Sequence, residues 1–111
     1  MRLLLLALLL VVEPAFSGDP RHCGPPVRDA AGKIARDAAV VAEFRRLHPC
    51  PSTGRATGVC PGWAVDHVLP LASCGCDVVS NMQWLPLSIK SASSPDAKDR
   101  WERRVYRCPK A

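Results

Sequence analysis

Two short segments decide the expected fold: WAVDHVLP at residues 63–70 and NMQWLP at residues 81–86. Both are rich in side chains that favour strands, and a proline closes each of them, so each segment is predicted to be a short strand. The intervening residues 72–80 hold a glycine between two cysteines and are predicted to form a loop. The central feature of the fold is therefore expected to be a pair of strands joined by a loop.

Helices are predicted on both sides of this strand pair. Apolar residues recur at helical spacing within residues 29–48, and prolines end that pattern. Residues 94–96, Ser-Pro-Asp, form a typical helix start, and this helix is expected to reach about Arg107, with Trp101 and Tyr106 among its packing residues. The order predicts an α+β protein: a small ββα unit with an additional N-terminal helix.

The N-terminus has the pattern of an export signal. Arg2 precedes the wholly apolar run Leu3–Val12, and small residues follow at the expected cleavage site. The run is shorter than the ~20 residues of a membrane-spanning helix. We therefore expect residues 1–17 to be a signal peptide, residues 18–28 an irregular arm and residues 29–108 the folded domain. The mature protein is expected in a periplasm or outside the cell, without stable membrane association.

Charge and composition narrow the class of protein. The chain of 111 residues is 48% hydrophobic and 23% charged, which is typical of a globular chain and excludes a disordered one. The formal net charge of +5 attracts polyanions, of which nucleic acid is one. Many small domains carry a similar excess of charge for solubility alone.

The cysteines predict disulfides. All 6 lie after the expected cleavage site, and an even number in a short exported chain is typical of a disulfide framework. Cys50 and Cys60 bracket a turn-rich loop and are expected to pair locally. The alternative is a zinc site formed by Cys50, Cys60, Cys74 and Cys76, although neither pair has the CxxC spacing of such sites.

Asp66, His67 and Asn81 form the constellation that carries chemistry. Phosphodiester hydrolysis needs a base that takes a proton from water and a cation that neutralises charge on the phosphate. The imidazole of His67 is suited to the first task, because it exchanges protons near neutral pH. The oxygens of Asp66 and Asn81 are suited to Mg²⁺ or Mn²⁺. Taken singly, each residue also has an ordinary interpretation, such as a turn role for Asn81.

In their order along the chain, these motifs resemble the HNH endonuclease family, and more narrowly small bacterial and phage HNH proteins. The segments that carry the resemblance are HPCPSTG at 48–54, CPG at 60–62, DHVLPL at 66–71, CGCD at 74–77, NMQW at 81–84 and KDRWE at 98–102. The resemblance implies a disulfide-stapled ββα-metal (His-Me finger) fold and cleavage of DNA, with RNA as a further substrate class.

The resemblance also implies residue roles. His67 matches the general base, and Asp66 matches the metal-binding residue beside it. Asn81 matches the middle asparagine, which binds the metal or orients the site. Asp77 matches a loop acid that fixes the turn. The implied cofactor is Mg²⁺ or Mn²⁺, with Zn²⁺ as an alternative.

The third family position departs from the pattern, because no histidine follows at the matching spacing. Nine residues after Asn81 stands Lys90, which cannot bind a metal while protonated but can hold a phosphate. Alignment backward from Lys98 and Asp99 places Asp96 near the third position instead.

The loop departs as well, because the glycine pair of the family is Gly75-Cys76 in this chain. Against the family pattern, Cys76 is expected to tether the loop to Cys23. The remaining pairs would then be Cys50–Cys60 and Cys74–Cys108.

The remaining expectations concern partners. The best candidates for phosphate contacts are Arg55, Arg100, Arg103, Arg104 and Arg107. The favoured hypothesis is an exported, metal-dependent endonuclease with little sequence preference; whether a cognate inhibitor protein exists is open. The alternatives are a protein that keeps the fold and binds nucleic acid or another partner without cutting, and a cysteine-based zinc module. The three tryptophans are expected in the core.

Overall fold

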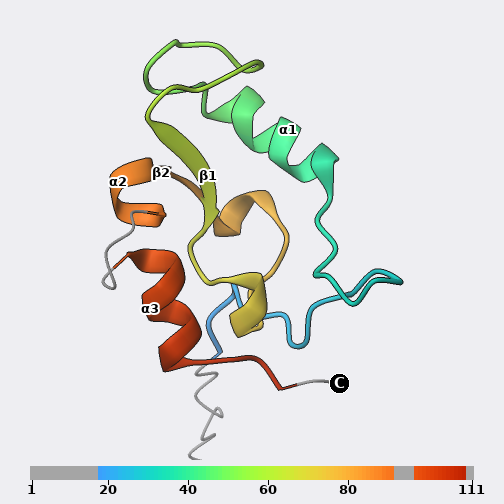
Figure 1. Cartoon of the computed structure of the whole chain (residues 1–111). Helices are drawn as coiled ribbons and strands as arrows, with labels where there is room; N and C mark the ends of the chain where they lie inside the picture. Colours follow the sequence, from blue (N-terminus) through green and yellow to red (C-terminus); the bar gives the residue numbers. More distant parts are fainter. Residues whose placement is uncertain (1–17, 92–96, 110–111) are drawn as a thin grey trace, which may run out of the picture.

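The structure is a computed structural model that describes residues 18–91 and 97–109 (Figure 1). The predicted signal peptide at residues 1–17 lies outside the described residues, and so do Asp96 and the predicted helix start at residues 94–96. None of the helices within the described ranges is long and apolar enough to cross a membrane.

A two-stranded antiparallel sheet lies at the centre, as the sequence predicts. Strand β1 (Trp63–His67) pairs with strand β2 (Met82–Pro86), so that His67 faces Met82 across the ladder. The predicted first strand extended to Leu69, but the chain leaves the sheet earlier. The N–H of Leu69 bonds the side chain of Asn81 instead of a neighbouring strand.

Helix α1 (Ala38–Leu47) packs beside the sheet and is shorter than predicted. The prediction is wrong for residues 29–37, because aspartate side chains bond nearby backbone there. The Asp29 carboxylate accepts two backbone N–H bonds within its own turn, which competes with a helix. Asp37 then caps α1 by accepting the N–H of Ala39.

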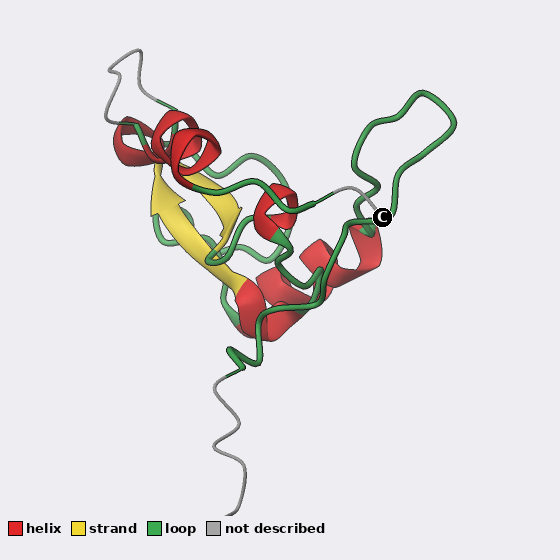
Figure 2. Ribbon diagram, turned by 90° about the horizontal axis from the view of Figure 1, so that it is seen from below, coloured by secondary structure: helices red, strands yellow, loops and turns green. Residues whose placement is uncertain are grey.

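Two short helices follow β2 and lie on the same side of the molecule (Figures 1 and 2). The sequence did not predict helix α2 (Leu87–Lys90), whereas helix α3 (Lys98–Val105) occupies the predicted C-terminal position. The prediction that Trp101 and Tyr106 pack in the core is wrong, because they are 54% and 48% exposed. Charged residues of α3 occupy the inner positions instead.

The core is small and is reinforced by disulfides. Phe44 of α1 is buried and its ring centroid lies 5.7 Å from that of Trp84 on β2. All three expected disulfides, Cys23–Cys76, Cys50–Cys60 and Cys74–Cys108, are present. The alternative of a cysteine-based zinc site is therefore wrong, because every thiol is already bonded. Three disulfides in a domain of this size are typical of proteins that fold in an oxidising compartment.

Candidate functional site

The segment between the strands, residues 69–81, forms a closed loop that we call the site loop. Gly75 sits at its tightest point, where a Cβ atom would overlap the backbone carbonyl of Leu69. Its N–H donates to the carbonyl of Pro70 at 2.8 Å. Only glycine permits this approach of two backbone segments, so the glycine of the predicted loop is required by packing.

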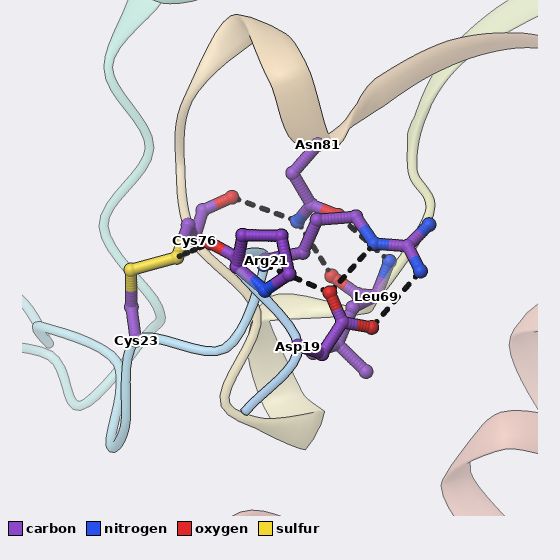
Figure 3. The surroundings of a disulfide bond; sticks show 7 residues. Asp19, Arg21, Cys23, Leu69, Cys76 and Asn81 are labelled. Atoms are coloured by element: carbon purple, nitrogen blue, oxygen red, sulfur yellow. Dashed lines mark hydrogen bonds and ion pairs between the residues drawn. A yellow bond between two sulfur atoms is a disulfide. The ribbon is translucent and has the colours of Figure 1, made fainter. Parts of the chain in front are cut away.

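Asn81 closes the site loop from within. Its side chain is fully buried, with 0% exposure. The amide oxygen accepts the N–H of Leu69 at 2.9 Å, and the amide nitrogen donates to the carbonyls of Leu69 and Cys76, both at 2.8 Å (Figure 3). Asn81 therefore positions the loop. The metal-ligand role expected for it from the sequence stays a prediction.

Disulfides tie the site loop to both ends of the described chain. Cys76 bonds Cys23 of the N-terminal arm (Figure 3), and Cys74 bonds Cys108 beyond α3. Backbone hydrogen bonds accompany each link: Cys23 donates to the carbonyl of Cys74 at 2.8 Å, and Cys108 donates to that of Ala72 at 2.6 Å. The loop is thus held covalently from two directions.

His67 stands at the end of β1, where the site loop begins. Its Nε2 atom lies 2.9 Å from Oδ1 of Asp77, and the imidazole is 10% exposed. The second oxygen of Asp77 accepts the N–H of Asp37 at 2.8 Å, at the start of α1. With the proton on Nε2 donated to Asp77, the Nδ1 atom is left as a proton acceptor. Nδ1 has no hydrogen-bond partner within the described part of the chain.

Asp77 is the site residue whose role the sequence did not reveal. It was expected only to fix the turn, yet it orients the candidate base. The contact joins residues ten positions apart, and it forms only because the site loop folds back on β1. The single signal in the sequence was a carboxylate following the glycine of the loop.

A second group of charged side chains meets next to His67, around its chain neighbour Asp66. We call it the lysine–carboxylate cluster; its members are Asp66, Lys90, Lys98, Asp99 and Glu102. Oδ1 of Asp66 lies 2.9 Å from the ammonium of Lys90, and Oδ2 lies 2.9 Å from that of Lys98. Lys90 also reaches Asp99 at 3.2 Å. The cluster joins β1 to α2 and α3.

The environment of the cluster shifts the ionisation of its members. Burial favours the neutral form of Asp66, but hydrogen bonds from Gln83, Lys90 and Lys98 outweigh it and lower the pKa of the carboxyl. Burial alone would lower the pKa of Lys90, yet its bonds to Asp66 and Asp99 raise it above the ordinary value.

Glu102 shifts in the opposite direction from Asp66. Burial raises its pKa, and the hydrogen bond from Lys98 offsets this only in part.

The two candidate residues Asp66 and His67 reach one cavity of about 220 Å³. Neighbouring residues in a strand point to opposite faces, but β1 ends at His67, which frees the chain to turn. Lys90 and the exposed Arg36 also line the cavity, together with Asp99, Glu102 and Ser73. The structure thus brings together His67, the predicted base, Asp66, the predicted metal-binding residue, and Lys90, a predicted phosphate contact.

The residues expected to hold a divalent cation do not fit one in this arrangement. Each oxygen of Asp66 is bonded to an ammonium group, and the amide oxygen of Asn81 is buried against Leu69. In the described residues, no three His, Cys, Asp or Glu side chains converge as a ligand set. A cation at Asp66 would have to displace Lys90 or Lys98.

The arginines expected to contact phosphate are scattered. Arg55 lies in the segment between α1 and β1, which extends away from the His67 end of β1 (Figures 1 and 2). Arg100, Arg104 and Arg107 are exposed on and after α3. Arg103 belongs to the same helix, but its side chain lies outside the described part of the structure.

Comparison of the chain with protein-family models, curated proteins and solved structures returns no match.

Proposed function

We propose that the protein is an exported endonuclease of the HNH type, which hydrolyses phosphodiester bonds of nucleic acid with His67 as the general base. One observation carries the proposal: Asp77 fixes the imidazole through Nε2, His67 lines a polar cavity, and no described residue bonds Nδ1. A base prepared in this way matches the requirements of proton transfer from water. The ββα order and the resemblance of the motifs support the same function.

The step needs few groups. Water attacks the phosphorus, its proton moves to Nδ1 of His67, and the bond to the leaving oxygen breaks while that oxygen takes a proton from solvent. The predicted Mg²⁺ or Mn²⁺ does not enter this step, because Asp66 and Asn81 do not fit it as they stand. The net charge of +5 draws the polyanionic substrate toward the protein.

The test is cleavage of a supercoiled plasmid, and of a labelled single-stranded RNA, by the oxidised protein. The assay runs with Mg²⁺, with Mn²⁺ and with EDTA. We expect His67→Ala to lower the rate by about 100-fold or more, the usual contribution of a general base. His22→Ala is the matched control, because His22 is an exposed histidine of the arm and should cut at the parental rate.

Two results would contradict the proposal. Either His67→Ala cuts as fast as the parent, or the folded parent cuts neither DNA nor RNA under any of these conditions. The second result, together with binding that weakens steeply as salt rises, would favour a nucleic-acid-binding protein without catalysis. The engagement of both Asp66 oxygens by lysines is the observation that keeps this second candidate in view.

A further inference from the structure

The ion pairs of Asp66 determine whether the positive charge at this site comes from a metal ion or from lysine side chains. A carboxylate beside a general base can bind a metal ion, and the metal ion then supplies positive charge to the site. Here its two oxygens are each bonded to an ammonium group, one from the end of α2 and one from the start of α3. The positive charge at Asp66 is therefore built into the chain itself.

The two lysines differ in what they can offer a substrate. Lys98 bonds Asp66, Glu102 and the carbonyl of His67, which together match the three donors of an ammonium group. Among the residues that the structure describes, Lys90 bonds Asp66 and Asp99, which leaves one of its three donors over. Lys90 also lines the cavity with His67, and its side chain is 21% exposed.

The positive and negative charges around the cavity balance, so their sum does not repel a phosphate. Three carboxylates, those of Asp66, Asp99 and Glu102, are matched by the cations Lys90, Lys98 and Arg36, which line the cavity or bond its wall. Burial raises the pKa of Glu102. Lys90 is the cation of this set that both lines the cavity and bonds Asp66.

We propose that Lys90 binds the scissile phosphate and that its ammonium group supplies the positive charge for which a metal ion is used elsewhere, so that cleavage proceeds without a divalent cation. Lys98 is a positioning residue that holds Asp66 and the end of β1. The inference rests on the proposed nuclease function and deepens it. The bonds made and broken are those of the hydrolysis given above. Lys90 neutralises charge on the non-bridging oxygens of the scissile phosphate.

The first arm of the test measures binding and needs no catalysis. Inorganic phosphate is titrated in EDTA while the imidazole resonances of His67 are followed by NMR. We expect saturable shifts in the parent and in Lys33→Met, the control at an exposed lysine. Lys90→Met should weaken phosphate binding by about 10-fold or more, the loss of one good charged contact. Lys90→Arg, which keeps the charge, should retain part of the affinity and guards against a folding defect.

The second arm measures cleavage in EDTA. We expect the parent to cut as fast as with Mg²⁺, and Lys90→Met to lower kcat by about 100-fold, as for the loss of one transition-state donor. Cleavage that requires a divalent cation, or an unchanged rate in Lys90→Met, would overturn the inference while leaving the nuclease function intact. A parent that never cuts overturns the nuclease function, and the phosphate titration then decides the role of Lys90 alone.

Discussion

The site loop and the lysine–carboxylate cluster both border His67, but different interactions hold them. Two disulfides, backbone hydrogen bonds and the fully buried Asn81 fix the loop. Ion pairs hold the cluster, and all of its members except Asp66 keep 14% to 36% of their side chains exposed. The loop sets the position of His67, the proposed base, whereas the cluster sets the charge around it.

This difference makes the two regions separable by experiment. Bonds within a buried loop do not respond to salt, and their loss leaves backbone groups without partners. Ion pairs near the surface are screened and contribute less to the free energy of unfolding. Changes in the loop should therefore unfold the protein, and changes in the cluster should alter its chemistry and its response to pH.

The largest effect on stability is expected for Asn81→Ala. The change leaves the N–H and the carbonyl of Leu69, which is partly buried, and the buried carbonyl of Cys76 without these bonds. We expect the free energy of unfolding to fall by about 2–5 kcal/mol, because an unpaired group costs about 1–3 kcal/mol when it is buried and less when water can reach it. Urea denaturation of the oxidised protein measures it.

Gln83→Ala is the matched comparison on the cluster side, where one amide bonds Asp66 at 3.0 Å. It should cost about 1 kcal/mol, the usual net value of a hydrogen bond. If the urea midpoints of the two variants coincided, the proposed distinction between the regions would be lost.

A smaller effect should appear in the pH dependence of stability. The folded pKa of Asp66 lies below its ordinary value of 3.8, so its ionisation stabilises the fold above that value. The contribution is lost as the pH falls through the folded pKa. We therefore expect the gap in unfolding free energy between the parent and Asp66→Asn to be constant near neutrality and to shrink below about pH 4.

The measurement is urea denaturation of both proteins at a series of pH values. Glu102 contributes with the opposite sign, because its pKa is raised. The charge of Asp66 is one cause of that raised pKa, so the contribution of Glu102 is smaller in Asp66→Asn than in the parent. A gap that stays constant down to about pH 2 would show that Asp66 is not held by its ion pairs.

The two regions also differ in how far the sequence predicts them. The strands were predicted because β-prone residues and closing prolines are local signals. The Cys50–Cys60 disulfide was predicted from the turn-rich loop, and the pairs at Cys74 and Cys76 came from the comparison with the HNH pattern. Local patterns thus predicted the strands on either side of the site loop, and the resemblance predicted its disulfides.

Long-range contacts were not accessible in the same way. The contact between Asp77 and His67 depends on loop closure, and the convergence of Lys90 and Lys98 on Asp66 depends on how α2 and α3 pack. The first helix was predicted too long. The spacing of apolar residues carries no information on the side chain of Asp29, which accepts hydrogen bonds from the backbone of its own turn. The sequence identified Asn81 as a site residue, but it did not show whether the side-chain amide contacts a metal or the backbone.

The central claim is that Asp77 holds His67 as a base, and Asp77→Asn tests it most directly. An amide at this position can keep the bond to Asp37 while donating to Nε2, which moves the imidazole proton to Nδ1, where the free lone pair is needed. Steady-state cleavage of a fluorogenic oligonucleotide measures kcat and KM, beside Asp19→Asn at an exposed ion pair. We predict that kcat falls by at least about 10-fold in Asp77→Asn, with KM and the melting temperature unchanged, and stays parental in Asp19→Asn. An Asp77→Asn protein with the parental kcat would contradict the account.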